Sequence, residues 1–506
     1  MNRRDFSRLA ATSLGAALAP AFSSATVPTA ADLDPWAAGF AQARETTPWT
    51  LGFRSVQADI APQAAVVRGR FPSAVHGVLY RNGPAVHELG GQRYRHWFDG
   101  DGMVQRFAIG PSGVAHSGSI VRTPKYRTEV EAGRRLQAAF GSQWPGMLPI
   151  ASPDALNAAN TGVLPVGGEV LALWEGGSAF RLQADTLRTI GPKVWRDDLA
   201  GAPFSAHPRV DPDGTIWNFG LSPINDMLVL YQIDGSGRLL KAEAMRLPDS
   251  PMVHDFAVTQ RHLVFLMPPL IYSLERAATH LSFMDSHVWR PDQPMRVLVI
   301  DKADWSRRQW LELPAGFLFH LGNAWEDEQG VIRLDYIHAA DPTALLQTDR
   351  EVMRGRHAAR PGYHIACARL DPRAGTASQD LLRVDAEFPR IDPRLTGLRH
   401  RQLFHAAQLS RTHPGFCAVA CSDVERGTTE VYAYGEDHMA EEHVFVAEPG
   451  SAPGTAGWVL GTALDLKGRC TLLSCFRSDR LAEGPVAQAT LPMALPLGFH
   501  GAFVGR

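Results

Sequence analysis

Short runs of β-branched and aromatic residues, separated by Gly, Pro and Asp, recur along the chain from about residue 60 almost to its end. They include "GTIWNFGLS" (214–222), "LVLYQID" (228–234), "MRVLVID" (295–301) and "CTLLSCFRSD" (470–479). Runs of this length bounded by turn residues predict β-strands. Helical periodicity is confined to pieces such as residues 128–140 and 341–355. The pattern therefore predicts an all-β fold.

So many short strands without an obvious linker favour sheets arranged in a closed ring. A tandem of β-sandwiches is the alternative, but a β-propeller of about seven blades accommodates 506 residues better. No repeat of the WD or kelch kind marks the blades. We expect one propeller domain over residues 26–506, with long insertions forming a partly helical cap.

Composition narrows the class of protein. Hydrophobic residues make up 45% of the chain and charged residues 20%, which is typical of a globular protein. The formal net charge of −2 gives no electrostatic reason to bind nucleic acid, so we expect no nucleic-acid partner. The five cysteines form no C-x-x-C pair, and buried free thiols are expected rather than a disulfide framework.

The first 25 residues, "MNRRDFSRLAATSLGAALAPAFSSA", combine Arg3 and Arg4 with a mild apolar run and a small-residue exit. This combination is typical of a twin-arginine signal peptide. It predicts a chain exported in the folded state by the twin-arginine machinery to the periplasm. A short amphipathic helix that begins the fold is the alternative. No later stretch reaches transmembrane length.

Four of the 19 histidines lie in apolar or small-residue settings beside strand-like sequence. They are His207 in "FSAHPRVDPDGT", His254 in "PMVHDFAVTQRHLVF", His320 in "FLFHLGNAWED" and His500 in "LGFHGAF". Their spacing places them on different blades, whose inner strands all face one axis, so the four imidazoles could converge on one metal ion. Each histidine taken alone is better explained as a core residue. No H-E-x-x-H, G-x-S-x-G or Walker motif offers other chemistry.

These contexts resemble the carotenoid cleavage oxygenase family, together with "GVLYRNGPAVHELGGQRYRHWFDGDGMVQRF" (77–107) and "LALWEGGSAFRLQADTLRTIG" (171–191). The resemblance covers nearly everything from residue 45 to 506. It implies a seven-bladed β-propeller, with a cap of loops over the face that holds one ferrous ion (Fe²⁺) per subunit. It also implies that His207, His254, His320 and His500 are the iron ligands, and that the final strand completes the ring.

The family orients its ligand histidines with outer glutamates. By resemblance Glu175, in "LWEGG", should serve His254, and Glu387, in "EFPRIDP", should serve His320. The third glutamate is expected in an acidic stretch near the tail, where this chain has Gly454, Thr455 and Ala456. The partner of His500 is then a backbone carbonyl, a water or an acid from elsewhere. This departure puts turnover in doubt and keeps a non-catalytic, lipophile-binding propeller as an alternative.

The resemblance implies oxidative scission of one C=C bond by O₂ to give two carbonyl products, with no catalytic side chain beyond the iron ligands. Stilbene-cleaving relatives carry a lysine just before the outer glutamate, whereas this chain has Trp174. The expected substrate is therefore a lipophilic polyene, a carotenoid or apocarotenoid; a stilbene or other phenylpropanoid is the alternative. Residues 136–150 are expected at the mouth of a substrate tunnel in contact with a membrane, or else in a buried cap loop. The aromatic residues expected in the tunnel wall are Phe98, Trp174, Phe283, Trp289 and Phe319.

Overall fold

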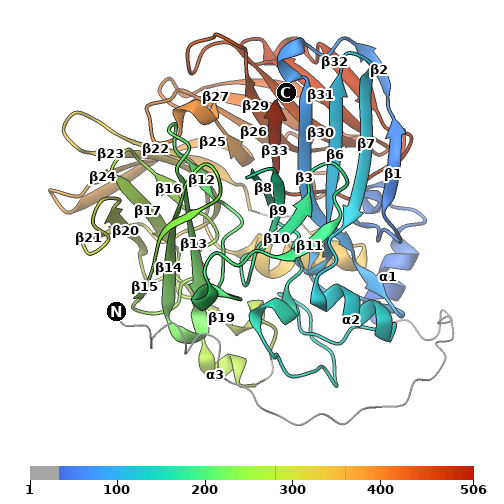
Figure 1. The fold of residues 1–506 in the computed structure, drawn as a ribbon, viewed down its shortest axis with the longest axis horizontal. Helices are drawn as coiled ribbons and strands as arrows, with labels where there is room; N and C mark the ends of the chain where they lie inside the picture. Colours follow the sequence, from blue (N-terminus) through green and yellow to red (C-terminus); the bar gives the residue numbers. More distant parts are fainter. Residues whose placement is uncertain (1–33, 280, 359–360, 506) are drawn as a thin grey trace.

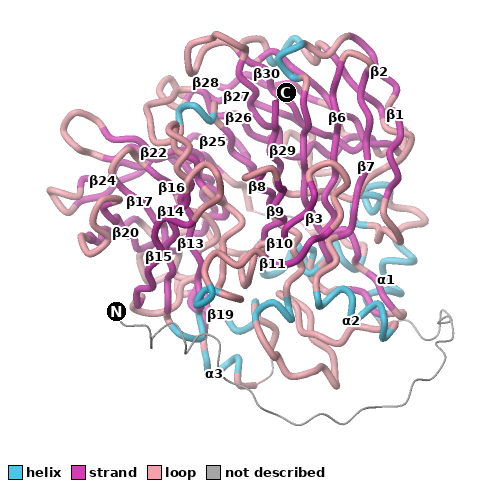
Figure 2. Tube along the Cα trace, in the orientation of Figure 1, coloured by secondary structure: helices cyan, strands magenta, loops and turns pink. Residues whose placement is uncertain are grey.

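The structure is a computed structural model that describes residues 34–279, 281–358 and 361–505. The predicted signal peptide, residues 1–25, lies outside the described residues. Strands dominate the described part of the chain, and most of its helices gather at one end of the sheets, the lower end in Figures 1 and 2. In this part of the chain no helix is long and apolar enough to cross a membrane.

The strands of the described residues form seven antiparallel blades. From its inner strand outward, blade 1 contains β33 (Gly501–Gly505), β3 (Gly77–Val86), β6 (Asp101–Gly110), β7 (Gly113–Ile120) and β1 (Ile60–Ala64). Blade 2 contains β8 (Gly162–Val166), β9 (Glu169–Leu173), β10 (Phe180–Gln183) and β11 (Thr189–Pro192). Blade 3 contains β12 (Arg209–Val210), β13 (Ile216–Ser222), β14 (Met227–Ile233) and β15 (Leu239–Arg246). Blade 4 contains β16 (Ala257–Val258), β17 (His262–Met267), β20 (Met295–Asp301) and β21 (Arg308–Leu313).

The remaining blades follow in chain order. Blade 5 contains β22 (Phe317–Glu326), β23 (Ile332–Ala339), β24 (His364–Asp371) and the first part of β25 (Thr376–Arg390). Blade 6 contains the second part of β25, β26 (Gln402–Ala407), β27 (Ala418–Asp423) and β28 (Thr428–Ala433). Blade 7 contains β29 (His438–Ala447), β30 (Gly457–Asp465), β31 (Cys470–Arg477), β32 (Ala487–Thr490) and β2 (Val66–Gly69). Two short hairpins, β4 (Glu88–Leu89) with β5 (Gln92–Arg93) and β18 (Leu270–Tyr272) with β19 (His287–Trp289), lie outside the blades.

Strands from opposite ends of the chain pair with each other to close the ring. β33 pairs antiparallel with β3, with Gly501 opposite Arg81 and Gly505 opposite Gly77, which confirms the predicted closure by the final strand. At the outer edge of blade 7, β2 pairs with β32 in the same way. Because each end of the chain completes a blade begun by the other end, the tail is held in a sheet, and the residue before β33 has a fixed position.

One strand is shared between two blades. Residues 376–385 of β25 pair with β24, whereas residues 386–390 pair with β26. The pairing with β26 also shifts register between Glu387 and Arg390. This long bent strand joins blades 5 and 6 into one continuous sheet, which the sequence pattern did not predict.

Short helices lie in the segments between the strands, and most of them belong to the cap at the lower end in Figure 1. They are α1 (Pro35–Ala43), η2 (Pro48–Phe53), η3 (Ser73–Val75), η4 (Trp97–Asp99), α2 (Pro124–Ala132), η5 (Pro153–Leu156), η6 (Asp197–Leu199), η7 (Pro223–Asn225), α3 (Leu274–Ala277), η8 (Met284–Ser286), η9 (Ala344–Thr348), α4 (Asp349–Glu351), η10 (Val352–Arg354), η11 (Pro393–Leu395) and η12 (Leu481–Glu483). The helical piece predicted over residues 341–355 is confirmed as the run η9–α4–η10. The piece predicted over 128–140 ends at Ala132 instead, because Gly133 (φ 64°) takes the left-handed conformation that terminates helices.

Burial of apolar side chains holds neighbouring blades together. The faces of blades 4 and 5, for example, share one cluster that includes Val264, Val297, Leu321 and Leu334. All five cysteines are free, and Cys417, Cys421 and Cys475 are buried, as predicted. The cap is fixed to blade 1 by a buried polar group that we call the α2 cluster. It consists of Tyr94, Asp101, Lys125, Glu129 and Arg135.

Candidate metal centre

Four histidines lie at the inner edges of four different blades. His207 comes two residues before β12, His254 three residues before β16, and His500 directly before β33, while His320 lies within β22. The strands that follow or contain them are the inner strands of blades 3, 4, 1 and 5, so their side chains meet near the ring axis. The four histidines selected from the sequence are thus brought together.

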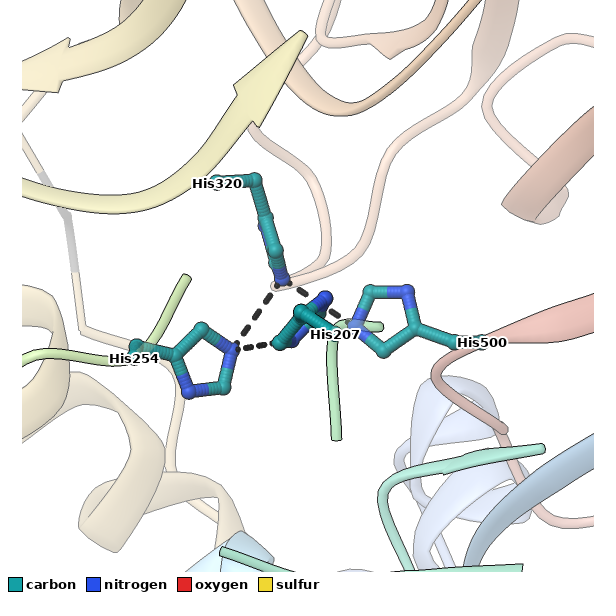
Figure 3. A group of neighbouring side chains, drawn as sticks. All are labelled: His207, His254, His320 and His500. Atoms are coloured by element: carbon teal, nitrogen blue, oxygen red, sulfur yellow. Dashed lines mark hydrogen bonds between the residues drawn. The ribbon is translucent and has the colours of Figure 1, made fainter. Parts of the chain in front are cut away.

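The imidazoles face one another through their Nε2 atoms (Figure 3). The Nε2–Nε2 distances are 2.9 Å from His207 to His254, 3.3 Å from His254 to His320, and 3.1 Å from His320 to His500. All four potential ligand atoms lie within 4.8 Å of one another. A group of nitrogens at this spacing can surround a single ion.

Three of the rings contact a carboxylate at Nδ1. Glu387 Oε2 lies 2.5 Å from His320 Nδ1, and Glu442 Oε1 lies 2.8 Å from His500 Nδ1. Glu175 Oε1 contacts His254 Nδ1. A carboxylate at Nδ1 requires the proton there, so the lone pair of Nε2 points into the cluster. The pairings expected for Glu175 and Glu387 are the ones observed.

The acid that serves His500 is Glu442, and this corrects the expectation from the sequence. Residues 454–456, where the family resemblance predicts the third glutamate, lie in the turn between β29 and β30. Glu442 lies in β29, the inner strand of blade 7, and is buried. It also accepts the N–H of Gly501 at 2.7 Å, and its partner Arg390 lies 2.8 Å away. The third carboxylate is therefore present, and its supposed absence no longer argues against turnover.

A sequence signal for Glu442 existed. "HMAEEHVFVA" places Glu441 and Glu442 side by side in a strand that is otherwise largely apolar. Strand side chains alternate between faces, so two consecutive acids in a buried strand indicate an irregularity. The register of β29 does shift between Ala440 and His443, and both acids are buried. Buried carboxylates of this kind need specific partners.

His207 differs from the other three histidines. Among the described residues no carboxylate contacts its ring, and its backbone N–H donates to Ser205 Oγ at 3.1 Å. Burial and the three neighbouring imidazoles lower the pKa of His207 well below its usual range. Its ring is therefore neutral at pH 7, as a metal ligand must be.

The donor set fits a divalent cation. The carboxylates hold the Nδ1 protons of His254, His320 and His500, so the Nε2 lone pairs of these three rings converge and are available to a cation placed between them. Burial lowers the pKa of His500 to about 4, which keeps that ring neutral. At His254 burial lowers the pKa, but Glu175 outweighs it and the pKa is raised, so a bound cation must displace that proton.

The charge balance of the site also favours a divalent cation. Glu175, Glu387 and Glu442 contact the imidazoles, and Arg390 pairs with Glu442. Burial raises the pKa of Glu442, but Arg390 and His500 outweigh it, and the pKa stays well below the usual range. With the four rings neutral, as metal ligands must be, three carboxylates and one guanidinium give a net charge of −2, which one divalent cation would neutralise. Imidazole ligands suit Fe, Zn, Cu and Ni.

Phe388 lies against this cluster in an unusual conformation. Its φ of 57° is a left-handed value that a bulky residue rarely adopts. The bulge lets its N–H donate to Glu387 Oε2 at 2.5 Å and places its ring 5.5 Å from the His320 ring and 5.6 Å from the His500 ring. Backbone strain of this kind is typical of functional sites.

A cavity of about 720 Å³ reaches the cluster from the cap. His254, His320 and His500 line it, as do Phe98, Trp174, Phe283 and Phe319, four of the five aromatic residues expected there. The prediction for Trp289 is wrong: it is not a lining residue, because it lies in β19 opposite Leu270 and packs on the apolar cluster behind the wall. Sequence reasoning missed Phe140, Phe388, Phe416 and Phe499, which also line the cavity.

The cavity opens at an apolar rim. Ile150, Ile224, Leu281 and Phe283 line it and are also exposed at the surface, at 50%, 65%, 40% and 38%. From the segment 136–150, Ala138, Ala139, Phe140 and Gln143 line the cavity together with Ile150. This segment therefore lies between the cavity and its rim, and is not an isolated cap loop.

Comparison with known proteins identifies relatives that match most of this chain. The family described as retinal pigment epithelial membrane protein matches residues 53–505. The apocarotenoid-15,15'-oxygenase of Synechocystis is 30% identical over 481 residues, which cover 90% of this chain and 96% of that protein. The resveratrol cleavage oxygenase 1 of Aspergillus fumigatus is 26% identical over 464 residues, covering 87% and 91%.

Solved structures agree with the sequence matches. The crystal structure of the cobalt-substituted Synechocystis apocarotenoid oxygenase superposes with a TM-score of 0.83 at 28% identity, covering 91% of this chain and 98% of that one. Fold, length and sequence point to the same group of proteins. The chain therefore belongs to the retinal pigment epithelial membrane protein family, that of the carotenoid cleavage oxygenases, and is a carotenoid-cleavage-type dioxygenase.

Proposed function

We propose that the chain binds one Fe²⁺ per subunit on His207, His254, His320 and His500 and uses O₂ to cleave one C=C bond of an apocarotenoid or carotenoid into two carbonyl products. The observation that carries the proposal is the convergence of four imidazole nitrogens at the inner end of an aromatic cavity. When bound, iron supplies the one-electron chemistry through which O₂ reacts with an alkene.

The residues of the chain do the remaining work. Glu175, Glu387 and Glu442 hold the Nδ1 protons and so keep each Nε2 as an electron-pair donor. The ring of Phe98 contacts those of Phe319 and Phe499 edge-on, with centroids 5.7 Å (Phe98–Phe319) and 5.2 Å (Phe98–Phe499) apart. Such a wall excludes water and can hold a flat conjugated chain in one register, and this register selects the bond that reacts.

The polyene is the preferred substrate class because of the wall next to Glu175. Trp174 lines the cavity there and presents an indole rather than a cation. A cavity of about 720 Å³ lies within the range of pockets that enclose elongated organic ligands. A stilbene or other phenylpropanoid is the second candidate, favoured by the similarity to the resveratrol cleavage oxygenase.

The apolar rim suggests how such a substrate arrives. Ile150, Leu281 and Phe283 line the opening of the cavity and are exposed, and Leu148, two residues before Ile150, is 45% exposed. A cluster of large exposed apolar residues favours contact with a lipid surface. We propose peripheral membrane contact at this rim, and export of the folded chain to the periplasm by the twin-arginine route. Cell fractionation of wild type and of an Arg3→Lys/Arg4→Lys variant tests the export.

The reaction is tested on the purified chain by metal analysis, by O₂ uptake with an apocarotenoid and with resveratrol, and by mass spectrometry of the products. We expect one iron per chain, uptake with the apocarotenoid and two carbonyl products that identify the broken bond. Uptake with resveratrol alone would assign the second candidate. Bound iron without uptake on either class would mean that the propeller binds its ligand without oxidising it.

A further inference from the structure

One ion pair connects the segments that carry three of the four histidines. Arg209 Nη2 lies 2.8 Å from Oδ1 and 2.7 Å from Oδ2 of Asp255. Arg209 is two residues after His207, and Asp255 directly follows His254. The side chains are 19% and 2% exposed, so this is a largely buried pair rather than a surface one.

The arginine also binds three backbone carbonyls of the two neighbouring blades. Its Nε donates to Phe256 O at 2.8 Å, its Nη2 to Leu321 O at 2.8 Å, and its Nη1 to Gly322 O at 3.2 Å. Phe256 is the second residue after His254, and Leu321 and Gly322 directly follow His320. One guanidinium on blade 3 therefore holds the backbone beside the histidines of blades 4 and 5.

The aspartate completes the same arrangement from its own side. Its Oδ2 accepts the N–H of Leu321 at 2.8 Å, and its Oδ1 accepts the N–H of Phe256 at 2.7 Å. Both oxygens thus have a guanidinium partner and a backbone partner. A fully hydrogen-bonded buried pair of this kind fixes geometry, because removing either partner leaves the other charge buried and unpaired.

Backbone irregularity makes these contacts available. The pairing of β22 with β23 shifts register between Leu318 and Leu321 and again between Leu321 and Ala324. Leu321 keeps Tyr336 as its partner in β23, whereas Gly322 falls in the second shift, and the carbonyls of both residues accept from Arg209. Packing at Gly322 is tight, because an added Cβ would lie 1.8 Å from Asp335 Oδ2 and 2.7 Å from Leu403 Cδ1.

We infer that Arg209 and Asp255 are positioning residues that set the spacing of His207, His254 and His320 around the metal. The inference rests on the proposed metal centre and goes beyond it. It also explains how His207, which has no carboxylate at its ring among the described residues, is placed: the residue two positions along is bound to both neighbouring segments. The hydrogen bonds of Arg209 and Asp255 join the two side chains to each other and to backbone groups, so their effect is on geometry, not on ligand identity.

The test uses Co²⁺ as the probe, because its visible absorption reports coordination geometry. The variants are Arg209→Lys, Arg209→Met and Asp255→Asn in the full chain, with all four histidines intact. Arg394 and Asp392 supply the matched control: they form a second Arg–Asp pair, 31% and 3% exposed, whose other contacts are to residues 451–454. Control variants are Arg394→Met and Asp392→Asn.

We expect Arg209→Met and Asp255→Asn to weaken Co²⁺ binding by about 10- to 100-fold and to change its absorption bands, as loss of outer partners does at other metal sites. Arg209→Lys keeps the charge but makes fewer of the contacts, so it should show an intermediate loss. The control variants should lower the melting temperature of the metal-free chain to a similar degree and leave Co²⁺ affinity and spectrum unchanged.

Wild-type affinity and spectrum in Arg209→Met and Asp255→Asn would overturn the inference, and so would an equal loss in the control variants. If Arg209→Met does not fold, Arg209→Lys and Asp255→Asn decide by the same two measurements. Failure of the proposed function shows separately, as a wild-type chain that binds the metal but consumes no O₂ with any polyene or stilbene.

Discussion

Two buried polar groups in this molecule differ in whether their own charges balance one another. In the α2 cluster, Lys125 Nζ lies 2.6 Å from Asp101 Oδ1, and Arg135 Nη1 lies 2.8 Å from Asp101 Oδ2 and 2.9 Å from Glu129 Oε2. Two cations balance two carboxylates. At the histidine centre three carboxylates meet one arginine, and the ligand nitrogens of four imidazoles lie within 4.8 Å of one another.

The comparison shows how a binding site can be separated from a structural one. Both groups are buried, and both shift pKa values strongly: Lys125 and Arg135 outweigh burial and lower the pKa of Glu129 to about 2. Perturbed titration alone therefore does not distinguish them. The distinction lies in charge and in unshared lone pairs, because a structural cluster satisfies itself and a metal site needs a cation to do so.

The largest effect should come from removing one of the four rings. His500→Ala is expected to reduce bound iron to background and to abolish O₂ uptake, while the metal-free chain stays folded because Glu442 keeps Arg390 and the N–H of Gly501 as partners. Iron per chain, by elemental analysis, and melting temperature are the measurements. His405→Ala is the control: this buried histidine contacts Ser422 Oγ at 2.9 Å, away from the cluster. Full iron content in His500→Ala would refute the four-ligand assignment.

In the α2 cluster, removing one charged side chain should lower stability and leave iron binding unchanged. Glu129→Gln leaves Lys125 and Arg135 buried with one carboxylate fewer, and breaking such a pair costs about 3–5 kcal/mol of unfolding free energy. Iron per folded chain should not change. Urea unfolding of the metal-free protein measures the loss. A variant that lost iron but not stability would show that the two groups had been assigned to the wrong classes.

Acid should act on this cluster through the same residue. The pKa of Glu129 is about 2 in the folded chain, below its ordinary value of 4.5, so its ionised form stabilises the fold. That contribution is complete above about pH 4.5 and is lost as pH falls toward 2. Metal-free wild type should lose more stability across this window than metal-free Glu129→Gln. Parallel curves of unfolding free energy against pH would contradict the assignment.

At the histidine centre the outer carboxylates should matter less than the rings. Glu442→Gln and Glu387→Gln keep the shape of the side chain and remove the charge that holds the Nδ1 proton. Each should weaken iron binding by about 10- to 100-fold. Competition with a chelator measures the affinity. Equal effects would support equal roles for the two glutamates, whereas wild-type affinity in Glu442→Gln would remove Glu442 from the centre.

Much of this comparison could be predicted from the sequence, and the rest could not for definite reasons. The four histidines, Glu175 and Glu387 lie in motifs that are contiguous in the chain. Glu442 does not, because its neighbourhood with His500 exists only after β33 closes the ring beside β29. β25 changes its partner between Asp385 and Ala386 without a break in the strand, so no turn residue marks the boundary between the two blades. Trp289 was misplaced because composition cannot tell the two faces of a short hairpin apart.

The smallest effect is expected from the backbone at Phe388, which lies against the histidine centre. The α2 cluster is the group with which this centre is compared. Gly is normally less stable than Ala within a strand by roughly 0.5–1 kcal/mol. At φ 57° the order should reverse, so that Phe388→Gly unfolds with about 1 kcal/mol more free energy than Phe388→Ala. Phe404, buried in β26, should show the normal order and is the matched control. Urea unfolding of the four metal-free variants measures both differences. The normal order at both positions would mean that the bulge beside Glu387 stores no strain, and that the histidine centre differs from the α2 cluster in charge alone.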